Sequence, residues 1–189
     1  MAHDHEVHDA TLAPLLRRWR RRMARPYLRG RVLDFGCNTG MLTAICRPDA
    51  YLGVDINEGA LELARTTHPE FEFDTKVSEH ERFDAIAGLA VIEHVDDPVD
   101  LLTRWSNMLA PGGTIVVTTP HPAYDWVLSV GAKLRLLSRH ALEDHKDLLD
   151  RRRMLELAGA AGLELVAYRR FMLGGNQLLV FRHKPGLET

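Results

Sequence analysis

The segment from Arg31 to Gly40, RVLDFGCNTG, constrains the fold of this chain more than any other part of the sequence. It begins as a short run of β-branched and apolar residues and ends in a glycine-containing loop, after which residues 40–46 have the apolar pattern of a helix start. A strand, a tight loop and a helix form the first unit of a parallel sheet that binds a nucleotide-like ligand at its carboxyl edge. The sequence predicts such a unit here.

A second apolar run, Tyr51–Val54, ends on Asp55. This order places the Asp55 carboxylate at the carboxyl edge of the neighbouring strand, where an acid can accept hydrogen bonds from both hydroxyls of a ribose. We therefore expect Asp55 to bind the ribose of a cofactor. The next residue, Ile56, should lie against the adenine, although an apolar residue there would also suit the core.

The glycine loop discriminates between cofactors. Loops that bind nicotinamide dinucleotides read G-x-G-x-x-G, whereas this loop has only Gly36 and Gly40, with Asn38 in place of the glycine that lets the backbone approach a pyrophosphate. A loop with no pyrophosphate to hold suits S-adenosyl-L-methionine, whose carboxylate can lie near the positive end of the following helix. We expect this cofactor to contact Gly36, Cys37, Asn38 and Gly40.

Four motifs in order resemble those of the class I S-adenosylmethionine-dependent methyltransferases. They are VLDFGCNTG at 32–40, GVDI at 53–56, FDAIAGLAVIEHV at 83–95 and LAPGGTIVV at 109–117. The Glu93-His94 pair, together with Pro120-His121-Pro122, is similar to the ubiquinone-biosynthesis O-methyltransferase group and related enzymes acting on small or lipid-like acceptors. The resemblance implies a Rossmann-like fold and a methyl-transfer activity.

The order of apolar patterns predicts an α/β fold. Strands are expected near 31–36, 50–55, 70–74, 83–89 and 113–119, with helices near 40–46, 58–67 and 98–109 between them. Two further strands, 163–168 and 177–182, flank the turn signal Gly174-Gly175-Asn176 and should pair antiparallel. The prediction is a three-layer αβα sandwich around a seven-stranded, mostly parallel sheet with a C-terminal antiparallel hairpin.

Length and composition fit one methyltransferase domain over residues 1–189. Of the 189 residues, 46% are hydrophobic and 26% charged, which is ordinary for a globular domain. Its expected parts are an N-terminal basic amphipathic helix (1–30), a cofactor-binding core (31–120), an acceptor-side lid (121–147), and a C-terminal helix, starting near 148, with the hairpin (148–189). Neither a signal-peptide pattern nor a run of about 18 apolar residues occurs, so we expect a cytoplasmic protein with reduced cysteines.

The N-terminal helix is expected to be amphipathic and basic. Its apolar stripe consists of Leu12, Leu15, Leu16, Trp19, Met23 and Tyr27, and its other faces carry Arg17, Arg18, Arg20, Arg21, Arg22 and Arg25. We favour a capping helix that packs its stripe on the domain. The alternative is a helix that touches an anionic membrane or steers a phosphorylated acceptor. The net charge of −2 argues against general nucleic-acid binding.

Three further residues are candidates for cofactor contacts. Asp34 at the end of the first strand should face the methionine end of the donor, or else only fix the loop. Asp74 at the end of the third strand could accept a hydrogen bond from the adenine amino group, although the usual Asp-Ala pair of the resembling family is absent. Leu89 at the end of the fourth strand should line the donor site.

Methyl transfer to a hydroxyl requires alignment of the acceptor and removal of its proton. His145 in the lid is our first candidate for the base and His94 the second, with His121 as a third and the absence of a histidine base as a further alternative. Resembling metal-dependent enzymes have a Glu three positions before the Glu-His pair, where this chain has Ala90. We therefore expect no metal.

The expected function is S-adenosyl-L-methionine-dependent methyl transfer, to an oxygen of a small-molecule or lipid-linked acceptor. The alternatives are a metal-dependent RNA 2′-O-methyltransferase, an NAD-dependent oxidoreductase and a non-catalytic donor-binding module. The oligomeric state is open.

Overall fold

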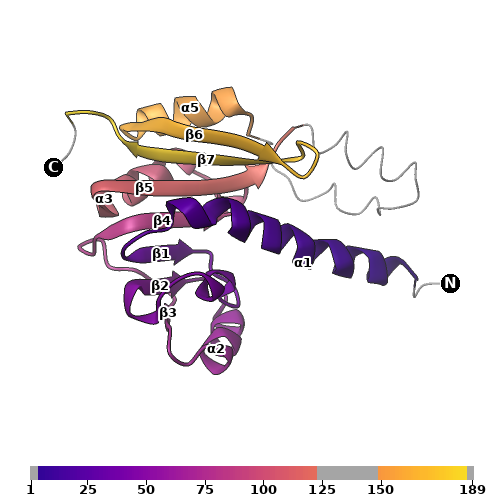
Figure 1. Cartoon of the computed structure of the whole chain (residues 1–189). Helices are drawn as coiled ribbons and strands as arrows, with labels where there is room; N and C mark the ends of the chain where they lie inside the picture. The colour runs from indigo at the N-terminus through magenta and orange to yellow at the C-terminus, as the bar shows by residue number, and fades with distance from the viewer. Residues whose placement is uncertain (1–3, 123–148, 187–189) are drawn as a thin grey trace.

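The computed structural model describes residues 4–122 and 149–186, with side chains from residue 14 onward. Seven strands form one sheet in the order β3-β2-β1-β4-β5-β7-β6 (Figure 1). They are β1 Val32–Phe35, β2 Tyr51–Val54, β3 Glu72–Asp74, β4 Phe83–Leu89, β5 Leu109–Pro120, β6 Leu163–Phe171 and β7 Asn176–His183. Strands β1 to β5 pair parallel, and β7 pairs antiparallel with both β5 and β6. The predicted sheet is confirmed.

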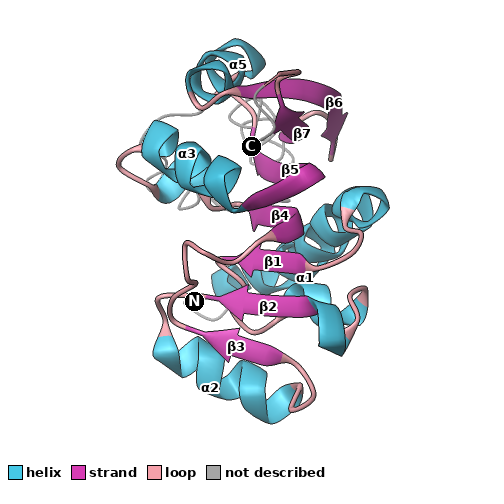
Figure 2. Ribbon diagram, turned by 90° about the vertical axis from the view of Figure 1, so that its left-hand side faces the viewer, coloured by secondary structure: helices cyan, strands magenta, loops and turns pink. Residues whose placement is uncertain are grey.

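Helices cover both faces of the sheet, as a sheet with buried parallel strands requires. They are α1 Asp4–Ala24, α2 Glu58–Thr67, α3 Pro98–Met108 and α5 Arg151–Ala160. Trp105 of α3 and Met154 of α5 belong to one core, and Ala24 of α1 and Leu61 of α2 belong to the core on the other side. Figure 2 shows α3 and α5 on one side of the strands and α1 on the other. The three-layer architecture is therefore confirmed.

The prediction of a helix at 40–46 is wrong. After the glycine loop the chain forms only a 3-10 turn, Met41–Ala44, and a second short turn, Pro48–Ala50, before β2 begins. Residues 41–50 are too few to build a helix and return to the sheet, and a proline cannot continue a helix. Leu42 instead packs in the same core as Ala24 of α1. A four-residue turn provides little of the helix dipole on which the expected carboxylate site depended.

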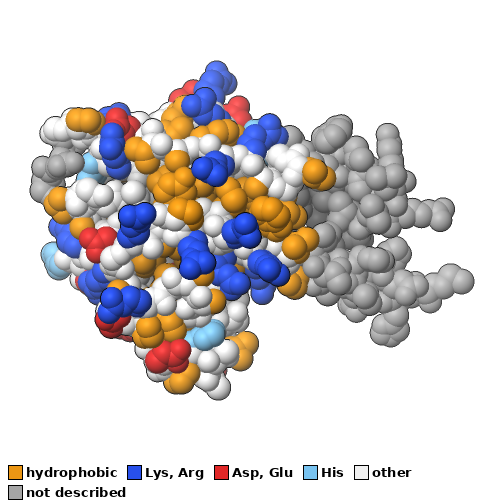
Figure 3. All heavy atoms as spheres, viewed as in Figure 1, with side chains coloured by type: hydrophobic (Ala, Val, Ile, Leu, Met, Phe, Trp, Pro, Cys, Tyr) orange, Lys and Arg blue, Asp and Glu red, His pale blue; other side chains and the backbone are white. Residues whose placement is uncertain are grey.

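The N-terminal helix packs through a face different from the predicted stripe. Leu16, Met23 and Tyr27 lie against the core, as expected, but Leu15 and Trp19 are 43% and 38% exposed. On the side of the molecule along which α1 runs, hydrophobic side chains lie among those of Lys and Arg (Figure 3). The helix also begins earlier than the stripe, at Asp4.

One other boundary differs from the prediction, at the C-terminal end of the lid segment. Helix α5 begins at Arg151 rather than near 148, because the Asp150 side chain caps it by accepting a hydrogen bond from the Arg153 amide at 2.7 Å. Most of the predicted lid lies outside the described residues.

Among the helices that the structure describes, none has the length and apolar character needed to cross a membrane.

Candidate functional site

A cavity of about 970 Å³ opens at the carboxyl edge of the sheet. Its walls are the end of β1 and the loop after it (35–39), the end of β2 (54–56), the turn after β3 (75–77), the end of β4 (89–91) and parts of the segment 94–104 that leads into α3. Helix α1 contributes Arg17 and Arg20 from the other side. The order of strands reverses between β1 and β4, and ligands of open α/β sheets bind at such a switch point.

The glycine loop is held between β2 and the segment after β4. The amides of Gly36 and Cys37 both donate to the carbonyl of Val54, at 2.8 and 3.0 Å. Gly36 has a φ of 72°, and a Cβ there would lie 2.6 Å from a methyl of Val91, so only glycine fits. Asn38 also adopts a left-handed conformation, with a φ of 49°, which asparagine tolerates better than most residues.

Of the expected loop contacts, Gly36, Cys37 and Asn38 line the cavity. Gly40 lies outside its lining, against the rings of Phe73 and His68.

Cys37 and Cys46 are both free thiols. Burial raises the pKa of the Cys46 thiol to about 12 and raises the pKa of the Cys37 thiol further. Neither cysteine is therefore an effective nucleophile at neutral pH.

Asp55 lines the cavity and already holds two backbone amides. Its Oδ2 accepts from the amide of Asn38 at 2.8 Å and its Oδ1 accepts from the amide of Asn57 at 2.9 Å. Two carboxylate oxygens offer about four acceptor positions, so each oxygen retains room for one more donor. Two hydroxyls of a ligand could bind there without breaking either bond.

Ile56 is 96% exposed and forms part of the cavity wall. The alternative that this residue serves the core is therefore wrong. An isolated, fully exposed isoleucine gains nothing from the folded protein alone, because its apolar surface remains in water. A flat apolar ligand in the cavity would cover it.

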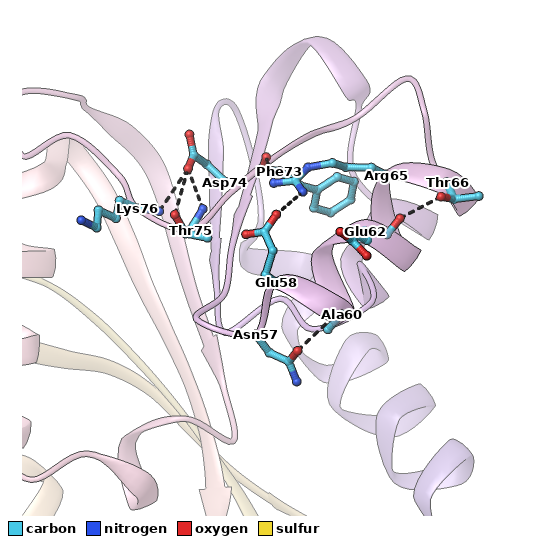
Figure 4. A network of polar contacts seen from close by, with 10 residues as sticks. All are labelled: Asn57, Glu58, Ala60, Glu62, Arg65, Thr66, Phe73, Asp74, Thr75 and Lys76. Carbon is cyan, nitrogen blue, oxygen red and sulfur yellow. Dashed lines mark hydrogen bonds and ion pairs between the residues drawn. The ribbon is translucent and has the colours of Figure 1, made fainter.

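At the end of β3 the turn 75–77, rather than the carboxylate of Asp74, lines the cavity. Asp74 accepts from the amides of Thr75 and Lys76, at 2.6 and 3.4 Å, and does not line the cavity (Figure 4). Arg65 of α2 bonds the Phe73 carbonyl at 3.2 Å and Glu58 at 2.6 Å. The Asp74 carboxylate therefore shapes the turn.

Asp34 lies behind the loop, outside the cavity lining, and is 3% exposed. Its carboxylate accepts a hydrogen bond from the hydroxyl of Tyr51 at 2.8 Å. Burial raises the pKa of Asp34 to about 7; the hydrogen bond from Tyr51 opposes this shift and the charge of Asp55 adds to it. This geometry favours the loop-fixing alternative, because side chains alternate across a strand and that of Asp34 shares a face with Tyr51.

The segment after β4 brings two polar side chains toward α1. Leu89 lines the cavity as expected, and the short turn Ile92–His94 follows it. His94 is exposed on the cavity wall, whereas Glu93 is 5% exposed. Oε2 of Glu93 finds no hydrogen-bond partner within the described part of the chain. Burial raises the pKa of Glu93, and the charges of Arg20 and His94 act in the opposite direction.

The three candidate histidines are placed differently. Only His94 reaches the cavity among those that the structure describes. The amide of His121 donates to the Gly175 carbonyl at 3.0 Å, and burial, followed by the charge of Arg170, lowers the pKa of its ring. His145 lies outside the described residues. Across 4–122 and 149–186, no three His, Cys, Asp or Glu side chains are grouped to hold a metal ion.

Sequence reasoning missed the two arginines that α1 contributes to the cavity, Arg17 and Arg20. A signal existed for Arg20, because it is spaced four residues after Leu16 and three before Met23. It therefore shares the helix face that packs on the domain. Lys76 and Arg104 were also missed and line the cavity from the β3 turn and from α3.

Comparison with known proteins identifies a family. A family model described as a methyltransferase domain matches residues 6–168. A ubiquinone biosynthesis O-methyltransferase from Dinoroseobacter shibae is 33% identical over 157 residues, which cover 75% of this chain and 62% of the relative. The chain thus spans less than two thirds of the length of that relative.

Solved structures show the same fold at low sequence identity. An S-adenosylmethionine-dependent methyltransferase from Clostridium acetobutylicum superposes with a TM-score of 0.65 at 13% identity, covering 85% of this chain and 87% of the other. A glycopeptide N-methyltransferase complexed with S-adenosyl-L-methionine has a TM-score of 0.64 at 15% identity, with 89% and 87% covered.

Proposed function

The chain belongs to the S-adenosyl-L-methionine-dependent methyltransferases, and on this premise we propose that it transfers a methyl group to an oxygen of a small or lipid-linked acceptor. The observation that carries the proposal is the cavity at the β1/β4 switch point, where a carboxylate with spare acceptor positions, Asp55, adjoins an exposed apolar side chain, Ile56. The choice of oxygen follows the name of the relative from Dinoroseobacter shibae.

The cavity lining fits each part of the donor. Asp55 would accept from the ribose hydroxyls and Ile56 would cover the adenine, with the turn after β3 at the adenine edge and Leu89 beside it. The loop residues Gly36 to Asn38 would follow the methionine portion. Asp34, Asp74 and Gly40 lie outside the cavity lining, so they would contact the donor only if the structure around them changed.

Arg17 is our candidate for the donor carboxylate. It lines the cavity next to the loop and also adjoins Thr39, Gly40 and Met41 on the outer side of that loop. The turn Met41–Ala44 is too short to attract an anion through its dipole, so a guanidinium supplies the charge that a full helix would offer.

When bound, S-adenosyl-L-methionine supplies a methyl group on a positively charged sulfur, so the protein must align an acceptor oxygen with it and remove the acceptor proton. His145 remains our first candidate for the base. His94 is the second, since it lines the cavity close to the end of β4. His121 is third, because it lies outside the lining.

The proposal is tested by isothermal titration with S-adenosyl-L-methionine and with NAD, followed by a mass-shift screen of hydroxylated acceptors with labelled donor. We expect binding of the first cofactor alone and incorporation of label into an acceptor oxygen. Binding of NAD would indicate an oxidoreductase. Donor binding without turnover on any acceptor would indicate a binding module, and magnesium-stimulated labelling of RNA would indicate the RNA enzyme.

A further inference from the structure

A second cavity, of about 670 Å³, lies between α1 and β5. One wall comes from the end of α1 and the 3-10 turn that follows it, Arg25–Tyr27, and the other comes from the start of β5 (111–114). The hydroxyl of Thr114 donates to the carbonyl of Tyr27 at 3.1 Å and so fixes the turn against the strand. Within the described chain, the second cavity shares no lining residue with the cavity at the switch point.

Arginines from three separate elements line the second cavity. They are Arg22 near the end of α1, Arg29 in the segment before β1, and Arg169 of β6. All three are exposed, and their side chains form no hydrogen bond or ion pair with the residues that the structure describes. Elsewhere on the surface, Arg65 and Arg182 form ion pairs with glutamates, at 2.6 and 2.7 Å. The guanidiniums around the second cavity therefore keep their donors available for a ligand.

The lining of the second cavity carries an excess of positive charge. Within the described chain its only acid is Asp84, and Oδ2 of that carboxylate already accepts a hydrogen bond from the amide of Arg31 at 2.7 Å. Three guanidiniums and one carboxylate leave an excess of two positive charges. A phosphate monoester carries about 1.5 to 2 negative charges at pH 7, whereas a carboxylate carries only one. Its oxygens also match the planar edges of guanidiniums.

Part of the lining is apolar or aromatic. Met23, Pro26 and Tyr27 lie on the α1 side and Pro111 lies on the β5 side. Met23 and Tyr27 are partly buried against the core, so packing holds them in place. Ligand sites in proteins are typically hollows of roughly 300–1,000 Å³ in which apolar walls surround a few polar groups. Inorganic phosphate alone would leave these apolar side chains in water, whereas a ligand with a ring would cover them.

We propose that the second cavity binds an organic phosphate monoester. Its phosphoryl group lies among Arg22, Arg29 and Arg169, and its apolar portion lies against Tyr27 and Pro111. This binding site is separate from the cavity at the switch point, so the proposal does not depend on the proposed function: a protein that methylates no acceptor would still bind the phosphate.

Three probes separate the contribution of the phosphoryl group from that of the ring. Phenyl phosphate has both groups, inorganic phosphate lacks the ring and phenol lacks the phosphoryl group. Isothermal titration at about pH 8, where the monoester is a dianion, should show phenyl phosphate binding at least about fivefold more tightly than either of the others. Saturating S-adenosylhomocysteine should leave this affinity unchanged, because the two cavities share no lining residue within the described chain.

Replacing Arg22, Arg29 and Arg169 together by Gln should weaken phenyl phosphate at least about tenfold and leave phenol unchanged, because only the phosphoryl group uses the guanidiniums. Replacing the same three residues by Lys keeps the charges but not the planar edges, so it should give an intermediate affinity. Circular dichroism should show both variants folded.

The control variant removes the same charge from other places. Arg18, Arg25 and Arg152 are exposed and lie outside the lining of the second cavity, and replacing all three by Gln should change the affinity for phenyl phosphate by no more than about twofold. An equal loss in the control and in the cavity variant would show diffuse attraction by the whole surface and would overturn the proposal. Equal affinities for phenyl phosphate and inorganic phosphate, or displacement of phenyl phosphate by S-adenosylhomocysteine, would also overturn it.

A phosphate monoester can be a soluble molecule or the headgroup of a lipid, and flotation with vesicles that contain phosphatidate distinguishes the two sources. We expect no retention of the protein, which together with the binding of phenyl phosphate would support a soluble ester. Retention that is lost when Arg22, Arg29 and Arg169 become Gln would support the same phosphate site with a lipid headgroup as its ligand.

Discussion

The carboxylate of Asp55 accepts a hydrogen bond from the backbone amide of Asn38 at 2.8 Å and so joins the end of β2 to the centre of the glycine loop. The two residues are 17 positions apart in the sequence. The acid proposed to bind the ribose therefore also determines the loop conformation that the methionine portion would meet. Changes at Asp55 should affect both ends of the donor site.

Replacing Asp55 by Ala should weaken the binding of S-adenosyl-L-methionine at least about tenfold, because hydrogen bonds to a charged group contribute about 1.5–3 kcal/mol each. Isothermal titration measures this change. Asp55→Asn, which keeps one oxygen acceptor, should lose less. Unchanged affinity in a folded Asp55→Ala variant would remove this residue from the donor site.

Replacing Ile56 by Ser should weaken donor binding about five- to thirtyfold, because covering an apolar side chain contributes about 1–2 kcal/mol. It should barely change the free energy of unfolding, since Ile56 is 96% exposed. Leu173→Ser is the matched control: Leu173 is 89% exposed in the turn between β6 and β7, away from the cavity. Equal donor affinities of the two variants would contradict the adenine contact.

Asp34 should make stability depend on pH. Its pKa rises from 3.8 to about 7 on folding, chiefly through burial, so between these values the folded protein binds more protons than the unfolded chain. The contribution of this group to stability is therefore present below about pH 4 and is lost as the pH rises toward about 7.

Asp34→Asn should remove this dependence while keeping an oxygen to accept the hydrogen bond from Tyr51. Urea unfolding from about pH 5 to about pH 8 should show the stability of the variant gaining on that of the wild type as the pH rises. Parallel profiles of the two proteins would show that Asp34 does not titrate in this range.

Activity should survive chelation by EDTA, because Ala90 replaces the carboxylate of related metal sites and Glu93 and His94 alone do not form the octahedral cage that magnesium prefers. A histidine should then remove the acceptor proton. His145→Gln, or in second place His94→Gln, should lower kcat by about 10²–10⁴ without weakening donor binding. Near-normal turnover in both variants, or loss of activity with chelator and recovery with magnesium, would contradict this assignment.

Flotation with acidic liposomes should show weak binding or none. Leu16, Met23 and Tyr27 are used in packing on the domain, which leaves the partly exposed Leu15 and Trp19 as the apolar contacts of α1 from residue 14 onward. Each arginine near an anionic surface adds about 1 kcal/mol, which salt screens. Binding that persists at physiological salt and is lost when Arg20, Arg21 and Arg22 become Gln would establish a membrane contact instead.

The sheet could be predicted because each strand corresponds to a short run of mostly apolar residues in the sequence. Apart from Asp34 and Asp84, the runs ending at Phe35, Val54 and Leu89 consist of apolar residues that are largely buried, as strands between two helical layers must be. The wrong prediction of a helix at 40–46 shows that a local apolar pattern is not enough to predict a helix. Its apolar residues suit a helix, but the few residues before Tyr51 and the contact of Leu42 with the core beside α1 leave only a short turn.

The sequence by itself determined the fold class, the cofactor loop and the position of Asp55, because these follow from short-range patterns and from the rule that parallel strands end at one edge. Only the tertiary structure decided which side chains meet in the cavity. Arg17 and Arg20 line it because α1 packs on the core that also contains Leu42 of the turn after the loop. Asp34 lies outside the lining, on the strand face where its carboxylate accepts a hydrogen bond from Tyr51. Such contacts join residues far apart in the chain, and no local pattern encodes the rotation of a helix about its own axis.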